Sequence, residues 1–290
     1  MGPRSTRRPR RCVATLSALA TILVTLGAEA QHAGWTPRSQ GNRLGADLDL
    51  WPTNDWTTVS VGFIGQVRLT RHFYLDFDFP WAFAARTPGP DRLTLGNPTI
   101  GVHYATALGR HAAFFIGGSG TIPTHYGARS NGAGNYDAAV LASYARALYD
   151  LHRFLPEYVY VRAPVGLEMA FRPLFLRFYV TPVFWGPVGN DVRVAELVLE
   201  HATEIELLAN MGLGGGIRLQ AVVMPTRDND LRVTRDDEAQ LAFEPFFAYE
   251  PEPHGFFARV GLLVAVDRPY GFGFEHDRVA TVRATLGGKW

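Results

Sequence analysis

The sequence predicts an all-β fold, a closed antiparallel transmembrane β-barrel of about 12 strands with one helical segment in a long outer loop. Three observations predict it. Apolar and polar residues alternate with a period of two after residue 42, the last alternating segment ends on the aromatic residue Trp290, and short turns alternate with long connections. A soluble β-sandwich would also show the alternation, so the choice of a barrel depends on the other two observations.

The first thirty residues have the composition of a cleaved signal peptide. Five arginines lie before Cys12, an apolar run extends from Val13 to Leu26, and the segment from Ala28 to Ala30 matches the small-residue pattern that a signal peptidase cleaves. The apolar run is shorter than the ~20 residues that a membrane-spanning helix needs. We therefore expect residues 1–30 to be removed and residues 31–290 to form one barrel domain.

Charge and cysteine content exclude several functional classes. The chain has 28 basic and 27 acidic residues, and removal of five arginines and Glu29 with the signal peptide would leave 23 and 26, a net charge of −3. Such a balance gives no basic surface, so no nucleic-acid partner is expected. Cys12 is the one cysteine of the chain. The mature protein would therefore have no disulfide, thiol nucleophile or thiolate metal site.

Alternation predicts twelve strands along the mature chain. In the last one, the even positions from Ala280 to Trp290 are apolar or small, whereas the odd positions from Thr281 to Lys289 are mostly polar. No continuous apolar run is long enough for a spanning helix, so strands must provide the spans. The expected extents are 43–51, 57–69, 73–84, 95–107, 111–122, 157–171, 174–186, 192–201, 205–224, 240–250, 256–266 and 278–290.

The connections fall into two classes if both termini lie on the periplasmic side. One class is short, and the other is mostly longer and polar or rich in glycine, which is typical of barrels in the bacterial outer membrane. Closure with both termini on one side requires an even strand number, and closure removes the unpaired edges that lipid cannot solvate. The expected turns are 70–72, 109–110, Arg172-Pro173, Ala202-Thr203 and 250–254, and the expected outer loops are 85–94, 123–156, 187–191, 225–239 and 267–277. Aromatic girdles are expected from Trp51, Trp56, Trp81, Trp185 and Tyr270 at the outer ends, and from Tyr104, Phe256 and Trp290 at the inner ends.

If the apolar face of each strand meets lipid, the charged face lines the lumen. Its charges have mixed sign. They either neutralise one another in a salt-bridge network that stiffens the wall, or form rings that filter solutes by charge in a narrow hydrophilic pore. Asp47 and Asp49 lie on this polar face as well. The candidate lumen residues are Arg68, Asp76, Asp78, Arg162, Glu168, Arg177, Glu206, Arg218, Glu244, Arg259 and Arg283.

The connection 123–156 is unusual because its second half predicts a helix. From Asp137 to Pro156, apolar residues recur at three- and four-residue spacing, with Asp137 as N-cap and Pro156 as a stop. This helix could fold into the mouth and constrict the pore, lie over the rim, or cover exposed barrel residues as a surface helix.

No catalytic, cofactor or metal site is expected, and the chain is not expected to be an enzyme. In the stretch from Gly212 to Gly216, Ile217 follows where a dinucleotide-binding motif needs its third glycine, so we interpret these glycines as close packing in a strand. The histidines have no HExxH or similar metal spacing. No HxSNG-like run indicates a phospholipase, and nothing more supports Ser119 or Ser143 as a nucleophile.

Two stretches carry a resemblance to known proteins. The amphipathic last strand, ending on Trp290, resembles the C-terminal insertion signal of outer-membrane β-barrels. That resemblance implies a Gram-negative outer-membrane location, lipid around the barrel and recognition of this strand by the barrel-assembly machinery. The stretch LGNPTIGV, from Leu95 to Val102, resembles a strand of the channel-like, porin-type barrels associated with degradation of aromatic compounds.

The first functional hypothesis is therefore a passive channel or transporter for small solutes of unknown identity. One alternative is a closed barrel with a structural or surface-interaction role, acting through residues 123–156 and 225–239. The other is an outer-membrane hydrolase.

Overall fold

The computed structural model of the chain describes residues 37–86, 91–124, 134–188, 195–209, 211–225, 239–251, 254–266 and 279–290. Within these ranges the fold is the predicted closed antiparallel barrel. The expected signal peptide, residues 1–30, lies outside the described residues. No helix in the described ranges is long and apolar enough to cross a membrane.

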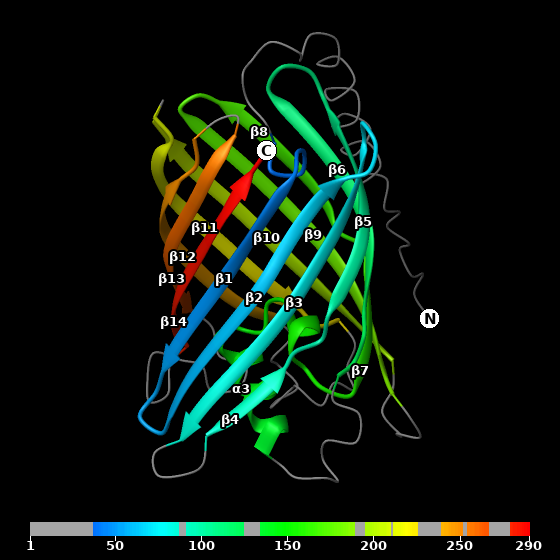
Figure 1. Ribbon diagram of the computed structural model, residues 1–290, viewed down its shortest axis with the longest axis vertical. Coiled ribbons are helices and arrows are strands. Elements are labelled where there is room, and N and C mark those ends of the chain that lie inside the picture. Colours follow the sequence, from blue (N-terminus) through cyan, green and yellow to red (C-terminus); the bar gives the residue numbers. More distant parts are fainter. Residues whose placement is uncertain are drawn as a thin grey trace, which may run out of the picture.

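The barrel wall consists, in the described residues, of β1 Arg43–Pro52, β2 Trp56–Arg68, β3 Phe73–Arg86, β4 Arg92–Leu95, β5 Thr99–Ala107, β6 Ala112–Thr121, β7 Tyr158–Arg162, β8 Val165–Phe171, β9 Leu174–Pro187, β10 Glu196–Leu208, β11 Leu213–Val223, β12 Ala239–Tyr249, β13 Gly255–Ala265 and β14 Ala280–Lys289. β4 and β5 both pair with β3, and β7 and β8 both pair with β6 and β9. Each of these two pairs is one interrupted strand, so the wall has twelve positions (Figure 1). The ring closes because β14 pairs with β1 and β9 pairs with β10.

One predicted turn is in the wrong place. The sequence indicated a turn at Ala202-Thr203, whereas β10 runs through this point to Leu208. The chain reverses between the end of β10 at Leu208 and the start of β11 at Leu213, and Gly212 adopts a φ of 85°. Polar residues occur on both faces of the strand here, which was mistaken for a solvated turn. Glu200 and Glu204 face the lumen, whereas His201 and Thr203 lie on the outward face, 2.9 Å apart between Nε2 and Oγ1. β10 also begins later than expected, at Glu196.

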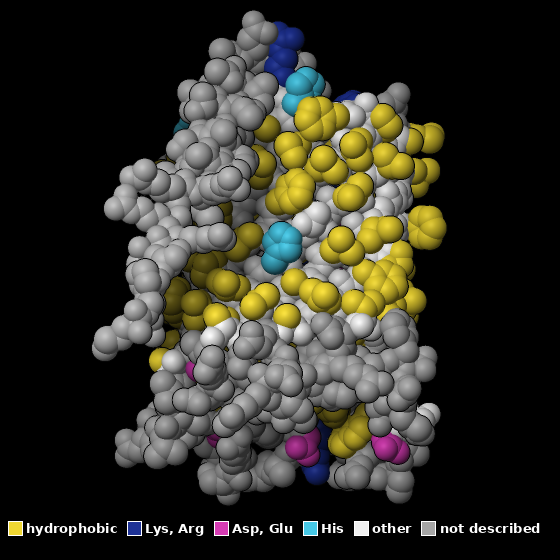
Figure 2. All heavy atoms as spheres, turned by 180° about the vertical axis from the view of Figure 1, so that it is seen from behind, with side chains coloured by type: hydrophobic (Ala, Val, Ile, Leu, Met, Phe, Trp, Pro, Cys, Tyr) yellow, Lys and Arg dark blue, Asp and Glu magenta, His cyan; other side chains and the backbone are white. Residues whose placement is uncertain are grey.

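The outward face of the wall is apolar. Figure 2 shows hydrophobic side chains covering the wall on one side of the barrel. The exposed fraction is 81% for Phe247 and 51% for Phe63, and many other large apolar side chains on the strands are similarly exposed. Soluble proteins rarely expose so continuous an apolar surface, whereas lipid solvates it.

The glycines of β11 serve close packing between strands. A Cβ at Gly216 would lie 2.1 Å from the carbonyl oxygen of Ile205, and one at Gly214 would lie 2.3 Å from that of Leu207. Larger residues would push β10 away. The glycine-rich stretch thus has a packing role in the wall.

The connection between β6 and β7 folds into the barrel. Its helix, α3 Gly134–Ala145, and a short 3₁₀ helix, η2 Leu151–Arg153, lie within the ring of strands near one end (Figure 1). We call residues 134–157 the plug segment. The helix was expected to continue to Pro156, but Ala147, Leu148 and Asp150 have positive φ angles of 52°, 61° and 60°.

These residues in the left-handed conformation interrupt the helix, and the plug segment continues as the short helix η2. The start of α3 at Gly134 places Asp137 in the first turn, near the positive end of the helix dipole.

Candidate functional site

The half of the lumen nearer the longer connections, which we call the outer half, is filled by apolar packing of the plug segment, and we call the opposite half the inner half. Leu148 and Leu151 belong to a buried cluster with Trp185 of β9. Ala147 packs in a second cluster with Leu263 of β13. The wall residues of both clusters lie near the strand ends that carry the longer connections. This half of the lumen therefore resembles the core of a soluble domain.

Arg153 fastens the plug segment to β1 and β3. Its Nε and Nη2 atoms donate to Asp78 at 2.6 and 2.8 Å, and Nη1 and Nη2 donate to Asp47 at 2.6 and 3.0 Å. Gly62 of β2 leaves the room for this side chain, since a Cβ there would lie 1.9 Å from Arg153 Nη2. The guanidinium thus bridges two wall strands through paired hydrogen bonds.

Asp150 and Arg146 form a second attachment. Arg146 donates to Asp49 of β1 and, at 2.8 Å, to Asp150. The backbone N–H of Asp150 donates to Glu200 of β10 at 2.9 Å, and Arg162 of β7 donates to the same carboxylate at 3.3 Å. Burial raises the pKa of Asp150, but Arg146 and the other nearby cations outweigh this and hold it well below its usual range. Asp150 is therefore ionised.

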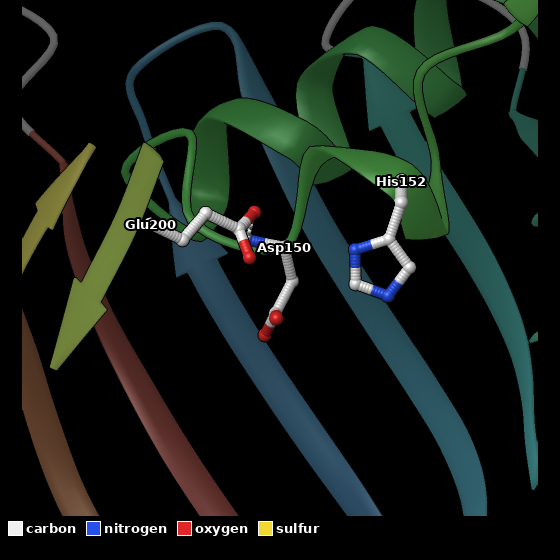
Figure 3. Close-up of side chains that lie close together, drawn as sticks. All are labelled: Asp150, His152 and Glu200. Carbon is white, nitrogen blue, oxygen red and sulfur yellow. Dashed lines mark hydrogen bonds between the residues drawn. The ribbon is translucent and has the colours of Figure 1, made fainter. Parts of the chain in front are cut away.

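Asp150, His152 and Glu200 have the residue types of a metal site (Figure 3). One ligand atom of each lies within 4.8 Å of the others, and His152 Nδ1 is buried without a hydrogen-bond partner. Both carboxylates, however, already accept from Arg146, Arg162 or a backbone N–H. Burial and the charge of Arg162 lower the pKa of His152 well below its usual value. We interpret the group as a latch between the plug segment and β10.

The segment before β1 enters the lumen from the opposite end. The backbone N–H of Ser39 donates to Glu168 at 3.1 Å, and its carbonyl oxygen lies 2.8 Å from Nε2 of His103. The side chain of Arg38 extends across to β10 and the end of β12, where it donates at 2.6, 3.2 and 3.0 Å to Glu204, Glu206 and Glu250.

These ion pairs belong to one connected network within the described residues. It joins nine cations to nine carboxylates, so its charges balance. The cations are Arg38, Arg43, Arg146, Arg153, Arg162, Arg177, Arg259, Arg283 and Lys289. The carboxylates are Asp47, Asp49, Asp78, Asp150, Glu200, Glu204, Glu206, Glu244 and Glu250.

The structure places ten of the eleven candidate lumen residues inside the barrel. Asp76 meets His103 Nδ1 at 2.5 Å, and Glu168 accepts from Ser39. Arg218 lies over the ring of Tyr149, with its Cζ 5.3 Å from the centroid. Seven others are members of the network, namely Asp78, Arg162, Arg177, Glu206, Glu244, Arg259 and Arg283. The exception is Arg68, which is exposed at the inner end of β2.

Sequence reasoning missed much of the network. Arg38 lies ahead of the first strand, and Arg146 and Arg153 lie in a connection whose position relative to the wall no local pattern reveals. Glu204 was placed beside a turn that does not exist. The available signal was the alternation in β1 and β10, which puts Asp49 and Glu204 on the polar face.

Two adjoining cavities occupy the inner half of the lumen. The first, of about 330 Å³, is lined by β1, β2 and β11 to β14, and the second, of about 310 Å³, mainly by β3, β5, β6, β8 and β9. Arg38, Gln66 and Asp76 line both cavities. The Arg38 side chain therefore lies where the two cavities meet, together with Gln66 and Asp76.

Comparison with known proteins shows the fold. No protein-family model and no curated protein matches the chain. The chain is similar to the solved structure of the NanC porin, with 10% identity and a TM-score of 0.52 over 85% of this chain and 98% of that one. It is also similar to an outer membrane channel from Pseudomonas putida F1, with 10% identity and a TM-score of 0.58 over 91% of this chain and 100% of that one. The chain thus has the fold of the outer-membrane porin and channel barrels.

Proposed function

We propose that the protein is a passive outer-membrane channel for small solutes, obstructed at its outer end by the plug segment, whose movement would open the path. The observation that carries the proposal is the pair of adjoining cavities in the inner lumen, about 330 and 310 Å³ in size. A barrel with a purely structural role would have no need of such spaces, because the same wall is filled by apolar packing in its outer half. The polar and charged lining suits hydrated solutes.

The arrangement of the ion pairs also supports transport. A balanced network holds the wall and the two inserted segments in place without a strong net field along the lumen. Arg38, with hydrogen bonds to three carboxylates, limits the passage between the cavities. We expect a narrow, slowly conducting channel and not an open general porin.

The proposal includes the route of the protein to the membrane. Residues 1–30 would direct export and then be cleaved. The barrel-assembly machinery would recognise β14, which ends next to Trp290 and closes the ring against β1. Trp290 is exposed beside the inner rim, where a terminal aromatic side chain is accessible to a partner or to interfacial lipid.

We propose no enzymatic role for the lumen. Asp76 and His103 have the arrangement of the acid and base of a catalytic triad, with Nδ1 of His103 2.5 Å from the carboxylate. The other ring nitrogen, however, lies 2.8 Å from the backbone carbonyl of Ser39, which offers no nucleophile. Ser143 donates to the Ala139 carbonyl within its own helix. Assay of lipid ester hydrolysis by the purified barrel is expected to give no activity above a heat-denatured sample.

The test of transport is planar-bilayer conductance of the refolded mature chain, with a heat-modifiability gel to show that the barrel has folded. Discrete and reproducible current steps are expected. A barrel that shifts on the gel but gives no steps, and that admits no small sugars or ions into liposomes, would favour the closed structural barrel. That second candidate has its own support in the close packing of the plug segment.

A further inference from the structure

One cation of the lumen lies outside the balanced network. Arg218 of β11 lines the first cavity, and no carboxylate among the described residues lies within ion-pair distance of it. Its cross-strand neighbour Glu244 is already shared by Arg259 and Arg283, at 3.5 and 3.0 Å. Nε of Arg218 is buried and has no hydrogen-bond partner. A buried guanidinium donor without a hydrogen-bond partner favours the binding of an anion that would accept from it.

The plug segment does not supply the missing charge. Tyr149 lies against Arg218, but burial raises the pKa of its phenol to about 12. The ring is therefore neutral and contributes a cation–π contact without an ion pair. Two of the described carboxylates that line the cavities lie outside the network. Glu168 lines only the second cavity, and Asp76, which lines both cavities, is hydrogen-bonded to Nδ1 of His103.

Arg259, whose side chain also lines the first cavity, has a second unused donor. Nη2 of Arg259 is buried without a hydrogen-bond partner, although Glu244 is near enough for electrostatic attraction. The guanidinium is stacked on Phe246, with its Cζ 3.5 Å from the ring centroid. Packing thus restricts where Arg259 can point. Two cationic side chains, both neighbours of Glu244, have donors to spare around one space.

The rest of the lining sets the shape and polarity of a ligand. Several residues around the first cavity are small or apolar, including Gly45, Ala248, Phe257 and Ala284. A cavity of about 330 Å³ accommodates a compact organic molecule. An ion such as phosphate would meet the cations but leave the apolar lining unused.

We propose that the first cavity binds a small organic anion, a carboxylate with a short apolar body, through Arg218 and Nη2 of Arg259. The carboxylate would accept from both guanidinium groups while its body packs against Phe257 and the neighbouring alanines. The inference rests on the proposed function in that the ligand reaches this site through the channel. The first cavity would then be a selective binding site on the solute path.

The direct test is isothermal titration of the folded, detergent-solubilised protein with butyrate and with the uncharged butyramide. Butyrate is expected to bind at least tenfold more tightly than butyramide, because charge-assisted hydrogen bonds to Arg218 depend on the carboxylate. Arg218→Gln should weaken butyrate binding at least tenfold. Equal binding of the two probes, absence of butyrate binding, or unchanged binding to the variant would each overturn the proposal.

Two further variants control the test. Arg68→Gln removes an exposed arginine at the inner rim that touches neither cavity, and it should bind butyrate as the wild type does. Arg218→Lys keeps the charge but loses the guanidinium fork, so its affinity should lie between wild type and Arg218→Gln. A heat-modifiability gel checks that each variant is folded.

Bilayer recordings on the same samples separate this proposal from the proposed function. Arg218→Gln should shift the reversal potential in a potassium chloride gradient toward cation preference. Conductance without butyrate binding would support the channel and contradict the anion site. Butyrate binding without conductance would support the anion site and contradict the channel.

Discussion

The two halves of the lumen are built in different ways from the same wall. In the outer half, the plug segment meets apolar side chains such as Trp185 and Leu263, and the space is filled. In the inner half, the wall presents arginines and carboxylates, and two cavities remain between them. Apolar surfaces can come together without directional constraints, whereas ion pairs must keep specific distances and angles. The ionic half therefore stays hollow while the apolar half packs.

The boundary between the halves is formed by charged residues of the plug segment. Arg146 and Arg153 lie on the inner side of the segment, where they reach Asp47, Asp49 and Asp78. The plug segment is thus held by apolar packing on one side and by ion pairs on the other. Each of the following changes tests one side of this arrangement.

The largest effect is expected from Arg153→Ala. The change leaves Asp47 and Asp78 with fewer partners inside the barrel, and breaking a buried ion pair by removing one member costs about 3–5 kcal/mol. The plug segment should open more often. Hydrogen exchange of its backbone amides should accelerate at least about a hundredfold, while β9 and β10 stay protected. Arg68→Ala is the matched control, and equal protection in both variants would contradict the attachment of the plug segment through Arg153.

Arg38→Ala tests the inner half. Its three carboxylate partners retain other cations, because Glu204 and Glu206 keep Arg177 and Glu250 keeps Arg43. The expected loss of unfolding free energy is therefore smaller, about 1–3 kcal/mol. Because the side chain lies where the two cavities meet, single-channel conductance should rise. A drop in stability with unchanged conductance would show that Arg38 is structural and does not limit the path.

Gly62→Ala is a smaller perturbation of the same attachment. The new methyl group would meet Arg153 Nη2 at 1.9 Å, so the guanidinium must move from Asp47 and Asp78. Conductance should increase, though less than in Arg153→Ala, because the flexible side chain can find a second position. Gly288→Ala serves as control, since nothing lies within 4 Å of a Cβ there. Equal conductance of the two alanine variants would contradict a steric displacement of Arg153.

The smallest effect concerns metal. If Asp150, His152 and Glu200 act as a latch, neither zinc ions nor EDTA should change the melting temperature, because arginines and a backbone N–H already satisfy the carboxylates. His152→Ala should leave this result unchanged. A rise in melting temperature with zinc that disappears in His152→Ala would instead show a metal centre.

The barrel wall could be predicted from the sequence because the face of each strand residue depends on the alternation of its near neighbours in sequence. A period of two assigns each strand residue to lipid or lumen, as in β14, and the short turns mark the strand ends. The turn predicted at Ala202 was wrong because charged residues such as Glu200 and Glu204 were assumed to face solvent, whereas they face the lumen.

The candidate site was predicted less well because its contacts are long-range. Asp49 and Glu204 lie on a polar face that alternation identifies, but their partners Arg146 and Arg38 lie in segments outside the wall. No periodicity in the sequence indicates that the residues before β1 and the plug segment fold into the lumen. The isolation of Arg218 likewise becomes visible only when the other arginines that line the first cavity have been assigned carboxylate partners.

Paired single-channel recordings of the wild type and Arg153→Ala test most directly whether the plug segment obstructs a solute path, with gels to confirm that both barrels are folded. If it does, the wild type will give small discrete steps and the variant will give larger ones. Silence from both folded proteins, or steps of equal size, would show that the plug segment does not control a path through the lumen.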